Sequence, residues 1–214
     1  KIHRNAVNVD AITKGYDGEP LFKRFSMTVE AGERIAIIGP NGIGKTTLLK
    51  TLAGDLRPDA GEVKWTDAAE LGIFAQDHAD DFANDATLFE WMGQWTKGGE
   101  QVVRGALGRM LFSSDDINKS VKVISGGEQG RMLFGKLTLT NPNVLLMDEP
   151  TNHLDMESIE ALNIALMAFE GTVIFVSHDR EFVESLATQV IEIKDKQITH
   201  FDGTYEEFQA HLGN

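Results

Sequence analysis

The sequence predicts an α/β fold, and a few short segments account for that prediction. Arg34–Ile38, Val144–Glu149 and Thr172–Ser177 each contain a run of apolar residues, which is typical of parallel strands buried on both faces. Helical spacing follows two of them, at Thr46–Leu52 and Met156–Phe169. Strands that alternate with helices indicate a parallel sheet covered by helices, and such sheets bind ligands at the carboxyl ends of their strands.

Composition places the chain among ordinary soluble globular domains. It has 214 residues, of which 42% are hydrophobic and 25% charged, and we expect a single domain over residues 1–214. The formal net charge of −13 disfavours non-specific binding to nucleic acid by this chain alone. There is no cysteine, so disulfides and thiolate metal sites are excluded. We find no signal peptide and no apolar run long enough to span a membrane. Because the chain opens at Lys1 on strand-like sequence, we expect a domain taken from a longer protein.

The first segment predicts a small antiparallel sheet. Ala6–Ile12 and Phe25–Val29 alternate apolar and polar residues, as half-buried strands do. Tyr16 is expected in the loop between them, where its ring can stack on an adenine. The alternative is a surface aromatic that packs on its own hairpin.

The residues after the first buried strand match the pattern G-x-x-x-x-G-K-[ST] at every fixed position. Glycines allow successive N–H groups to converge on an anion, and the following helix adds the positive end of its dipole. Lys45 is placed to reach the β- and γ-phosphates, and the Thr46 hydroxyl to bind Mg²⁺. The sequence therefore predicts a nucleoside triphosphate site. The residues expected to hold the nucleotide here are Gly39, Pro40, Asn41, Gly42, Ile43, Gly44, Lys45, Thr46 and Thr47.

A mainly helical subdomain is predicted downstream. After a turn at Leu56–Gly61, two short strands are expected at Glu62–Trp65 and Leu71–Phe74, and Gln76 follows them either as a site residue or as a plain loop residue. Residues 77–124 have helical spacing at Leu88–Trp95 and further on at Val102–Phe112. We interpret this stretch as a helical subdomain inserted into the α/β core, with its own small apolar core.

Ser125-Gly126-Gly127 opens a helix that runs to about Leu139. A serine before a helix is a common N-cap, and that is the simplest interpretation. Such a start also presents free N–H groups to an anion, and the local sequence does not choose between the two.

Two later strands end in polar residues. The strand from Val144 delivers Asp148 and Glu149, which fit an Mg²⁺-organising acid and a base that polarises the attacking water. His178 follows the strand Thr172–Ser177 and can hydrogen-bond a γ-phosphate. The alternatives are a pair of solvated loop acids and a structural histidine. A closing hairpin at 189–201 and a terminal helix at Tyr205–Leu212 complete the chain.

In this order, the motifs resemble the ATP-binding cassette family over essentially the whole chain. Tyr16 corresponds to the adenine-stacking aromatic, residues 39–46 to the Walker A loop, Gln76 to the Q-loop glutamine and residues 125–129 to the signature, in which Glu128 stands where transporters commonly have glutamine. The resemblance implies a phosphate-loop NTPase core with an antiparallel β subdomain and an inserted helical subdomain.

The later motifs complete the resemblance. Asp148 and Glu149 correspond to the Walker B aspartate and the catalytic glutamate, Asn152–Asp155 to the D-loop and His178 to the switch histidine. The resemblance implies catalytic roles for Lys45, Gln76, Glu149 and His178, and Mg²⁺ contacts from Thr46, Gln76 and Asp148. Two cassettes of the family face each other head to tail, so Ser125, Gly126 and Gly127 are expected to contact the ATP of a partner cassette.

Residues 147–155 and 177–182 resemble the F class of the family, and Phe89–Met92 and Gly130–Lys136 are similar to its YbiT branch. F-class proteins are tandem cassettes without transmembrane domains that act on the ribosome in translation. No long insertion lies between Gln76 and Ser125, so we expect the second cassette of such a protein, located in the cytoplasm. Contacts with ribosome, rRNA or tRNA are expected from segments outside this chain.

Three classes of function remain open on the sequence. The first is a translation-associated ATPase, the second is the ATPase subunit of a membrane transporter, and the third is an interaction module that does not hydrolyse ATP. The intact set of Lys45, Asp148, Glu149 and His178 disfavours the third.

Overall fold

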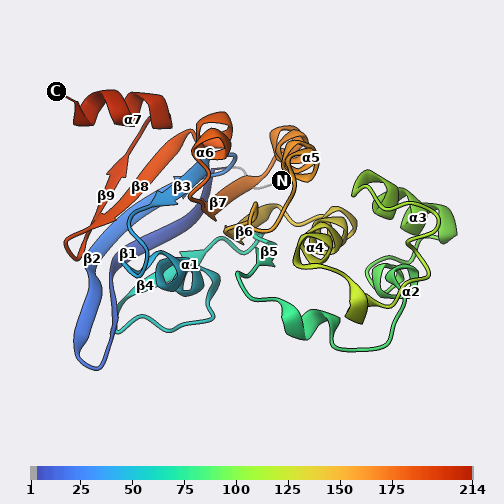
Figure 1. The fold of residues 1–214 in the computed structure, drawn as a ribbon. Helices are drawn as coiled ribbons and strands as arrows, with labels where there is room; N and C mark the ends of the chain where they lie inside the picture. Colours follow the sequence, from blue (N-terminus) through green and yellow to red (C-terminus); the bar gives the residue numbers. More distant parts are fainter. Residues whose placement is uncertain (1–3, 214) are drawn as a thin grey trace.

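A computed structural model describes residues 4–213, and its main element is a six-stranded sheet (Figure 1). The strand order is β5-β6-β7-β3-β8-β9. The five strands from β5 to β8 in this order are parallel to one another, and β9 is antiparallel to β8. The bounds are β3 Arg34–Ile38, β5 Leu71–Phe74, β6 Val144–Asp148, β7 Thr172–Val176, β8 Gln189–Lys194 and β9 Gln197–Phe201.

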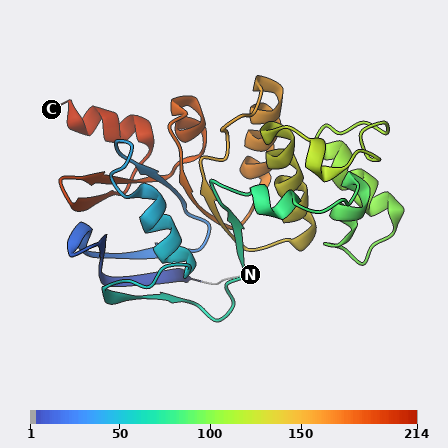
Figure 2. The ribbon, with the colours of Figure 1, turned by 60° about the horizontal axis from the view of Figure 1, so that its bottom comes forward.

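A second, antiparallel sheet has the order β2-β1-β4. Its long strands β1 (Asn5–Tyr16) and β2 (Glu19–Glu30) form a hairpin, and β4 (Ala60–Trp65) pairs with β1. Helix α1 (Lys45–Ala53) lies between the two sheets (Figure 2). Its Leu48 and Leu52 are fully buried among side chains from both sheets, in one of two apolar cores.

Side chains of the large sheet alternate between the two cores, as expected for pleated strands. On β6, Leu146 faces the core around α1, whereas Leu145 and Met147 face the second core. The second core includes residues of α4 (Gly126–Thr140), α5 (Met156–Ala168) and α6 (Arg180–Leu186). Both faces of the parallel sheet are therefore buried, which explains the continuous apolar runs in the sequence.

The region between β5 and α4 is helical and lies at one end of the molecule, opposite α7 (Tyr205–Leu212), as Figure 1 shows. It contains the 3₁₀ turns Ala79–Phe82 and Val121–Val123 and the helices α2 (Leu88–Gly93) and α3 (Glu100–Arg109). Its aromatic side chains stack, with Phe82 and Trp91 rings 5.0 Å apart. The division of the chain into one domain with a subdomain at 77–124 stays an interpretation.

Several local expectations need correction. The prediction that placed Tyr16 in a loop is wrong, because β1 continues to Tyr16 and only two residues separate it from β2. Strand β4 begins at Ala60, inside the stretch expected to be a turn. The sequence also gave no expectation of α6, a short helix that Asp179 caps by accepting the Phe182 N–H.

Candidate active site

A cavity of about 660 Å³ opens at the carboxyl ends of β3, β6 and β7. Its volume lies within the range of small-molecule sites. Residues from six segments line it: Tyr16, Leu21, Asn41, Gly42, Gly44, Lys45, Thr46, Thr47, Gln76, Asp148, Glu149, Asn152, Val176 and His178. The fold thus brings together most of the residues that the sequence singled out.

Glycine is required where the loop turns into α1. Gly44 is the N-cap of α1, with a φ of 119°, and a Cβ at this position would approach Leu21 to 3.1 Å. No side chain caps this helix start, and its first residues, Gly44 to Thr47, line the cavity. Such an arrangement suits a phosphate group.

Three charged or polar side chains meet at the cavity. Lys45 Nζ lies 3.2 Å from His178 Nε2, and the same ring nitrogen lies 3.0 Å from Glu149 Oε1. Lys45 also donates to the Gly39 carbonyl at 2.5 Å. The backbone N–H of His178 donates to Glu149 Oε2 at 3.3 Å. This hydrogen bond joins the loop after β6 to the loop after β7.

Burial changes the acidity of these groups. Burial raises the pKa of the Glu149 carboxyl above its ordinary value, and the nearby His178 and Lys45 partly oppose this. Burial also lowers the pKa of Lys45, against the pull of the Glu149 and Asp148 carboxylates. A carboxylate with a raised pKa is better suited to accept a proton near neutral pH.

Asp148 offers an open position for a cation. Among the described residues, its Oδ1 is one of two buried side-chain atoms without a hydrogen-bond partner. Burial raises the pKa of Asp148, while the Thr46 hydroxyl and nearby lysines oppose the shift. A buried, unpartnered carboxylate oxygen beside a hydroxyl fits the hard oxygen ligands that Mg²⁺ prefers. The described residues contain no cluster of three acidic, histidine or cysteine side chains that can hold a metal, so a magnesium ion here would take further ligands from phosphate and water.

Tyr16 stands at the mouth of the cavity. Its hydroxyl lies 3.4 Å from the Thr47 hydroxyl, and 52% of its surface is exposed. The ring is therefore held against α1 while its surface stays available to a flat apolar group.

The signature residues lie elsewhere. Ser125, Gly126 and Gly127 contribute nothing to the lining of the cavity, and the two glycines lie instead against the turn at His153 that follows β6. A Cβ on Gly127 would approach the His153 carbonyl oxygen to 2.5 Å, so only glycine fits this contact. These three residues therefore lie outside the cavity of their own chain.

Three residues of the cavity, Leu21, Asn152 and Val176, were not among the expected site residues. Leu21, on β2, packs on Gly44. Asn152 follows Glu149 by three residues, and its N–H donates to the Glu149 carbonyl at 3.1 Å. The sequence placed Asn152 in a polar turn next to the two acids, and this position could have marked it as a site residue. Leu21 is recognised as a cavity residue only from the fold.

The fold and the cavity define a phosphate-loop nucleotide-binding domain. A model of the family described as ABC transporter matches residues 22–152. The chain belongs to this family of ATP-binding cassettes, whose members are ATPases and work as pairs. Two curated relatives named as members of the ABC transporter F family match it, so it is an ATP-binding cassette of the F class.

Curated relatives agree with this assignment. The chain is 60% identical over its whole length to a probable ATP-binding protein YbiT of Escherichia coli O157:H7, of which it covers 41%. It is 40% identical over 94% of its length to ABC transporter F family member 5 of Arabidopsis thaliana, of which it covers 30%. The chain thus spans less than half the length of these relatives.

Solved structures show the same fold. One is cbiO1 of Clostridium perfringens, a part of the ABC transporter complex cbiONQ, with 25% identity, a TM-score of 0.77 and 98% and 92% of the two chains covered. Another is a bacterial Atm1-family ABC exporter with ATP bound, with 22% identity and a TM-score of 0.80, where all of this chain matches 43% of the exporter chain. In the part of this chain that the structure describes, no helix combines the length and apolarity needed to cross a membrane.

Proposed function

We propose that this cassette hydrolyses ATP at the cavity beside α1, and that it does so as part of a translation factor that binds the ribosome. The contact between Lys45, His178 and Glu149 carries the first half of the proposal. At the end of a phosphate loop, it puts an ammonium group 3.2 Å from a histidine nitrogen, and a carboxylate with a raised pKa 3.0 Å from the same nitrogen.

Each expected residue then has a physical task. The loop from Gly39 to Thr47 and the Lys45 ammonium hold the phosphates, and Tyr16 stacks on the adenine. Glu149 accepts a proton from the attacking water, and His178 contacts the γ-phosphate. Thr46, Gln76 and Asp148 would hold a magnesium ion, which neutralises charge on the phosphates.

The signature residues of this chain, Ser125 to Gly127, serve the ATP of a second cassette in this proposal. Their position outside the cavity of their own chain supports that role. Each ATP then lies between two cassettes and holds them together through charge-assisted contacts, and hydrolysis removes those contacts.

The proposed role in translation rests on membership of the F class, and the net charge indicates which segments contact RNA. The chain carries a formal net charge of −13, so we assign the contacts with RNA to segments of the longer protein outside this cassette. The protein then acts in the cytoplasm. Co-sedimentation of the full-length protein with ribosomes in the presence of ATP tests this role, and a protein that stays in the supernatant would contradict it. A role as transporter subunit has no specific observation in its favour.

Calorimetry tests the nucleotide site directly. Replacing Lys45 with alanine removes a charge-assisted contact with phosphate, and we expect ATP affinity to fall about tenfold or more. Lys64→Ala, on the exposed side of β4, serves as the control and should bind ATP like the wild type. An unchanged affinity in the Lys45 variant would refute the proposed site.

A further inference from the structure

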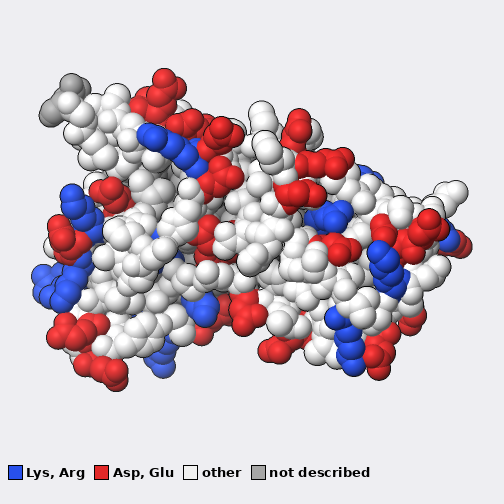
Figure 3. Space-filling view, viewed as in Figure 1, with Lys and Arg blue, Asp and Glu red and all other residues white. Residues whose placement is uncertain are grey.

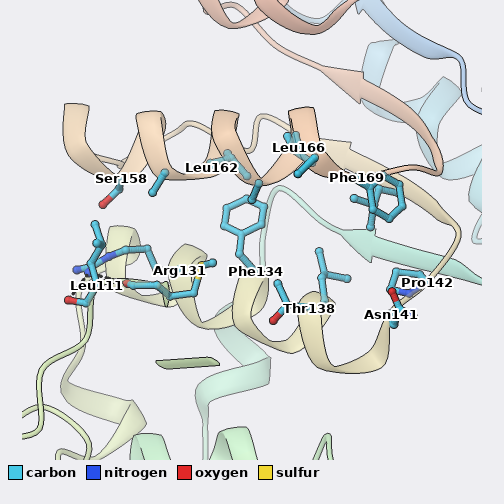
Figure 4. A pocket seen from close by; sticks show the side chains of 16 residues that line it. Leu111, Arg131, Phe134, Thr138, Asn141, Pro142, Ser158, Leu162, Leu166 and Phe169 are labelled. Carbon is cyan, nitrogen blue, oxygen red and sulfur yellow. Dashed lines mark hydrogen bonds between the residues drawn. The ribbon is translucent and has the colours of Figure 1, made fainter. Parts of the chain in front are cut away.

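An apolar groove runs between α4 and α5, away from the nucleotide cavity (Figure 4). Its volume is about 250 Å³. Phe134 from α4 and Leu162 and Leu166 from α5 point into the space between the helices, as Figure 4 shows. Along α5 the groove extends from Ser158 to Ala168, which corresponds to about 15 Å or nearly three helical turns.

Small side chains keep the groove open. Ala161, Ala165 and Ala168 of α5 line it, and their spacing places them on one face of the helix. Across from them, Thr138 of α4 is exposed. A second apolar helix can approach closely over such a stripe, because no long side chain stands in the way.

The surface of α5 beside the alanine stripe is also apolar. Ile164 and Met167 are 62% and 63% exposed, and Ile164 neighbours Ala161 and Ala168 by the three- and four-residue spacing of a helix. An apolar groove that continues onto an exposed apolar helix surface is typical of a site for an amphipathic helix.

Charge indicates which kind of helix fits. Glu157 and Glu160 lie on the exposed side of α5 next to the groove. Residues at its far end, among them Pro142 and Phe169, also line a second cavity of about 650 Å³ that carries Glu70 and Glu170. Among the described residues, none of these four glutamates forms an ion pair, and several acidic side chains lie on the surface near α5 in Figure 3.

Positive charge at the groove is already engaged. Arg131, at the opposite end, donates to the carbonyls of Met110 and Leu111 and stacks 4.7 Å from the Phe112 ring. The border of the groove is thus acidic along one helix and most acidic at one end. This excludes a phosphate backbone as occupant and favours a basic polypeptide.

We propose that the groove between α4 and α5 is a docking site for a basic amphipathic helix of a partner polypeptide. Its apolar face covers Phe134 and the alanine stripe, and lysine or arginine residues at one of its ends reach Glu70 and Glu170. This interaction goes beyond the proposed function and needs no nucleotide, so the two proposals can fail separately.

Fluorescence anisotropy on this chain, without nucleotide, tests the proposal. The probe is a labelled 14-residue peptide with leucines at helical spacing on one face and lysines on the opposite face and at one end. A second peptide has glutamate in place of each lysine, and a third has the composition of the first in scrambled order. We expect saturable binding of the first peptide and at least about tenfold weaker binding of the other two, since both the apolar face and the charge contribute.

Variants locate the site. Ala165→Leu fills the groove and keeps a good helix former, so binding should weaken about tenfold while the fold stays intact. Ala210→Leu, on exposed α7, is the matched control and should bind like the wild type. The double variant Glu70→Gln, Glu170→Gln should weaken binding and reduce its salt dependence, and Glu206→Gln on α7 is its control.

Three outcomes would overturn the proposal. The first is equal binding of the lysine and glutamate peptides, and the second is unchanged binding by Ala165→Leu. The third is a wild-type chain that forms dimers in sedimentation equilibrium and loses them in Ala165→Leu, because the occupant would then be a second copy.

Discussion

Glu149 combines an unusual backbone with a buried carboxylate. Its φ of 49° lies in the left-handed region, and its N–H donates to the Val176 carbonyl at 2.8 Å. Side chains at such positive φ values are uncommon, and the strain is tolerated where the surroundings hold the residue in place. Here the neighbouring strand and His178 hold the carboxylate toward the cavity.

Removing the charge of Glu149 separates catalysis from binding. Glu149→Gln keeps the shape of the side chain but cannot accept the proton from water. We expect turnover to fall by about 10²-fold or more while ATP affinity stays close to that of the wild type. A steady-state ATPase assay with calorimetry in parallel measures both, and Glu181→Gln on α6 controls for the loss of a carboxylate. Full turnover in the Glu149 variant would remove this residue from the role of base.

We also predict that the effect of Glu149→Gln on the stability of the fold depends on pH. Because burial raises the pKa of Glu149 in the folded state, the protonated form is favoured by folding. The stability that this group contributes is complete below its unfolded pKa and is lost as pH rises through the folded pKa, so the ionised carboxylate destabilises the fold near neutral pH. Glu149→Gln should therefore raise the Tm near neutral pH and have no effect below about pH 4.5.

Thermal unfolding across this pH range provides the test. A Tm that falls near neutral pH would mean that the pairing of Glu149 with His178 and Lys45 outweighs its desolvation, contrary to the prediction.

At the scale of single elements, two side chains stabilise the start of α4. The Ser125 hydroxyl accepts the Glu128 N–H, and the Glu128 carboxylate accepts the Ser125 N–H, which is a complete capping box. The departure from glutamine at position 128 is thus compatible with a well-ordered helix start. Next to it, Gly127 allows the helix to contact the turn at His153.

Loss of this cap should be measurable in solution. Ser125→Ala removes the acceptor for the Glu128 N–H, and we expect the free energy of unfolding to fall by about 1 kcal/mol. Ser125→Asp supplies another acceptor and should recover most of the loss. Urea denaturation measures the difference, with the exposed Ser114→Ala as control. Equal stability of Ser125→Ala and wild type would mean that the cap contributes nothing.

At the scale of the whole molecule, the residues of the proposed site fall into two separate groups. The cavity residues gather at the carboxyl ends of the parallel strands, whereas Ser125 to Gly127 lie outside the cavity. Under the proposed function, one chain alone cannot complete a site around ATP. A second cassette has to supply the missing donors.

The isolated chain should therefore hydrolyse ATP slowly, and its rate per molecule should rise with protein concentration, because pairs form by mass action. An ATPase assay over a wide dilution series measures this. Glu149→Gln sets the background rate. Rapid turnover that does not change on dilution would contradict a shared site.

The sequence alone was sufficient for the parallel core and for most of the cavity. Apolar runs at Ile35–Ile38, Val144–Met147 and Val173–Val176 predict strands because full burial on both faces leaves little room for polar residues. Residues that follow such strands, among them Asp148, Glu149 and His178, then meet at one edge of the sheet by geometry alone.

Only the tertiary structure decided how distant segments meet. Leu21 reaches Gly44 because β2 brings it beside the start of α1, and the groove between α4 and α5 stays open because small alanines of α5 line it. The orphaned oxygen of Asp148 likewise depends on what the fold brings near it. Local patterns record which side chains are buried, but contacts between segments far apart depend on packing, which no short stretch of sequence encodes.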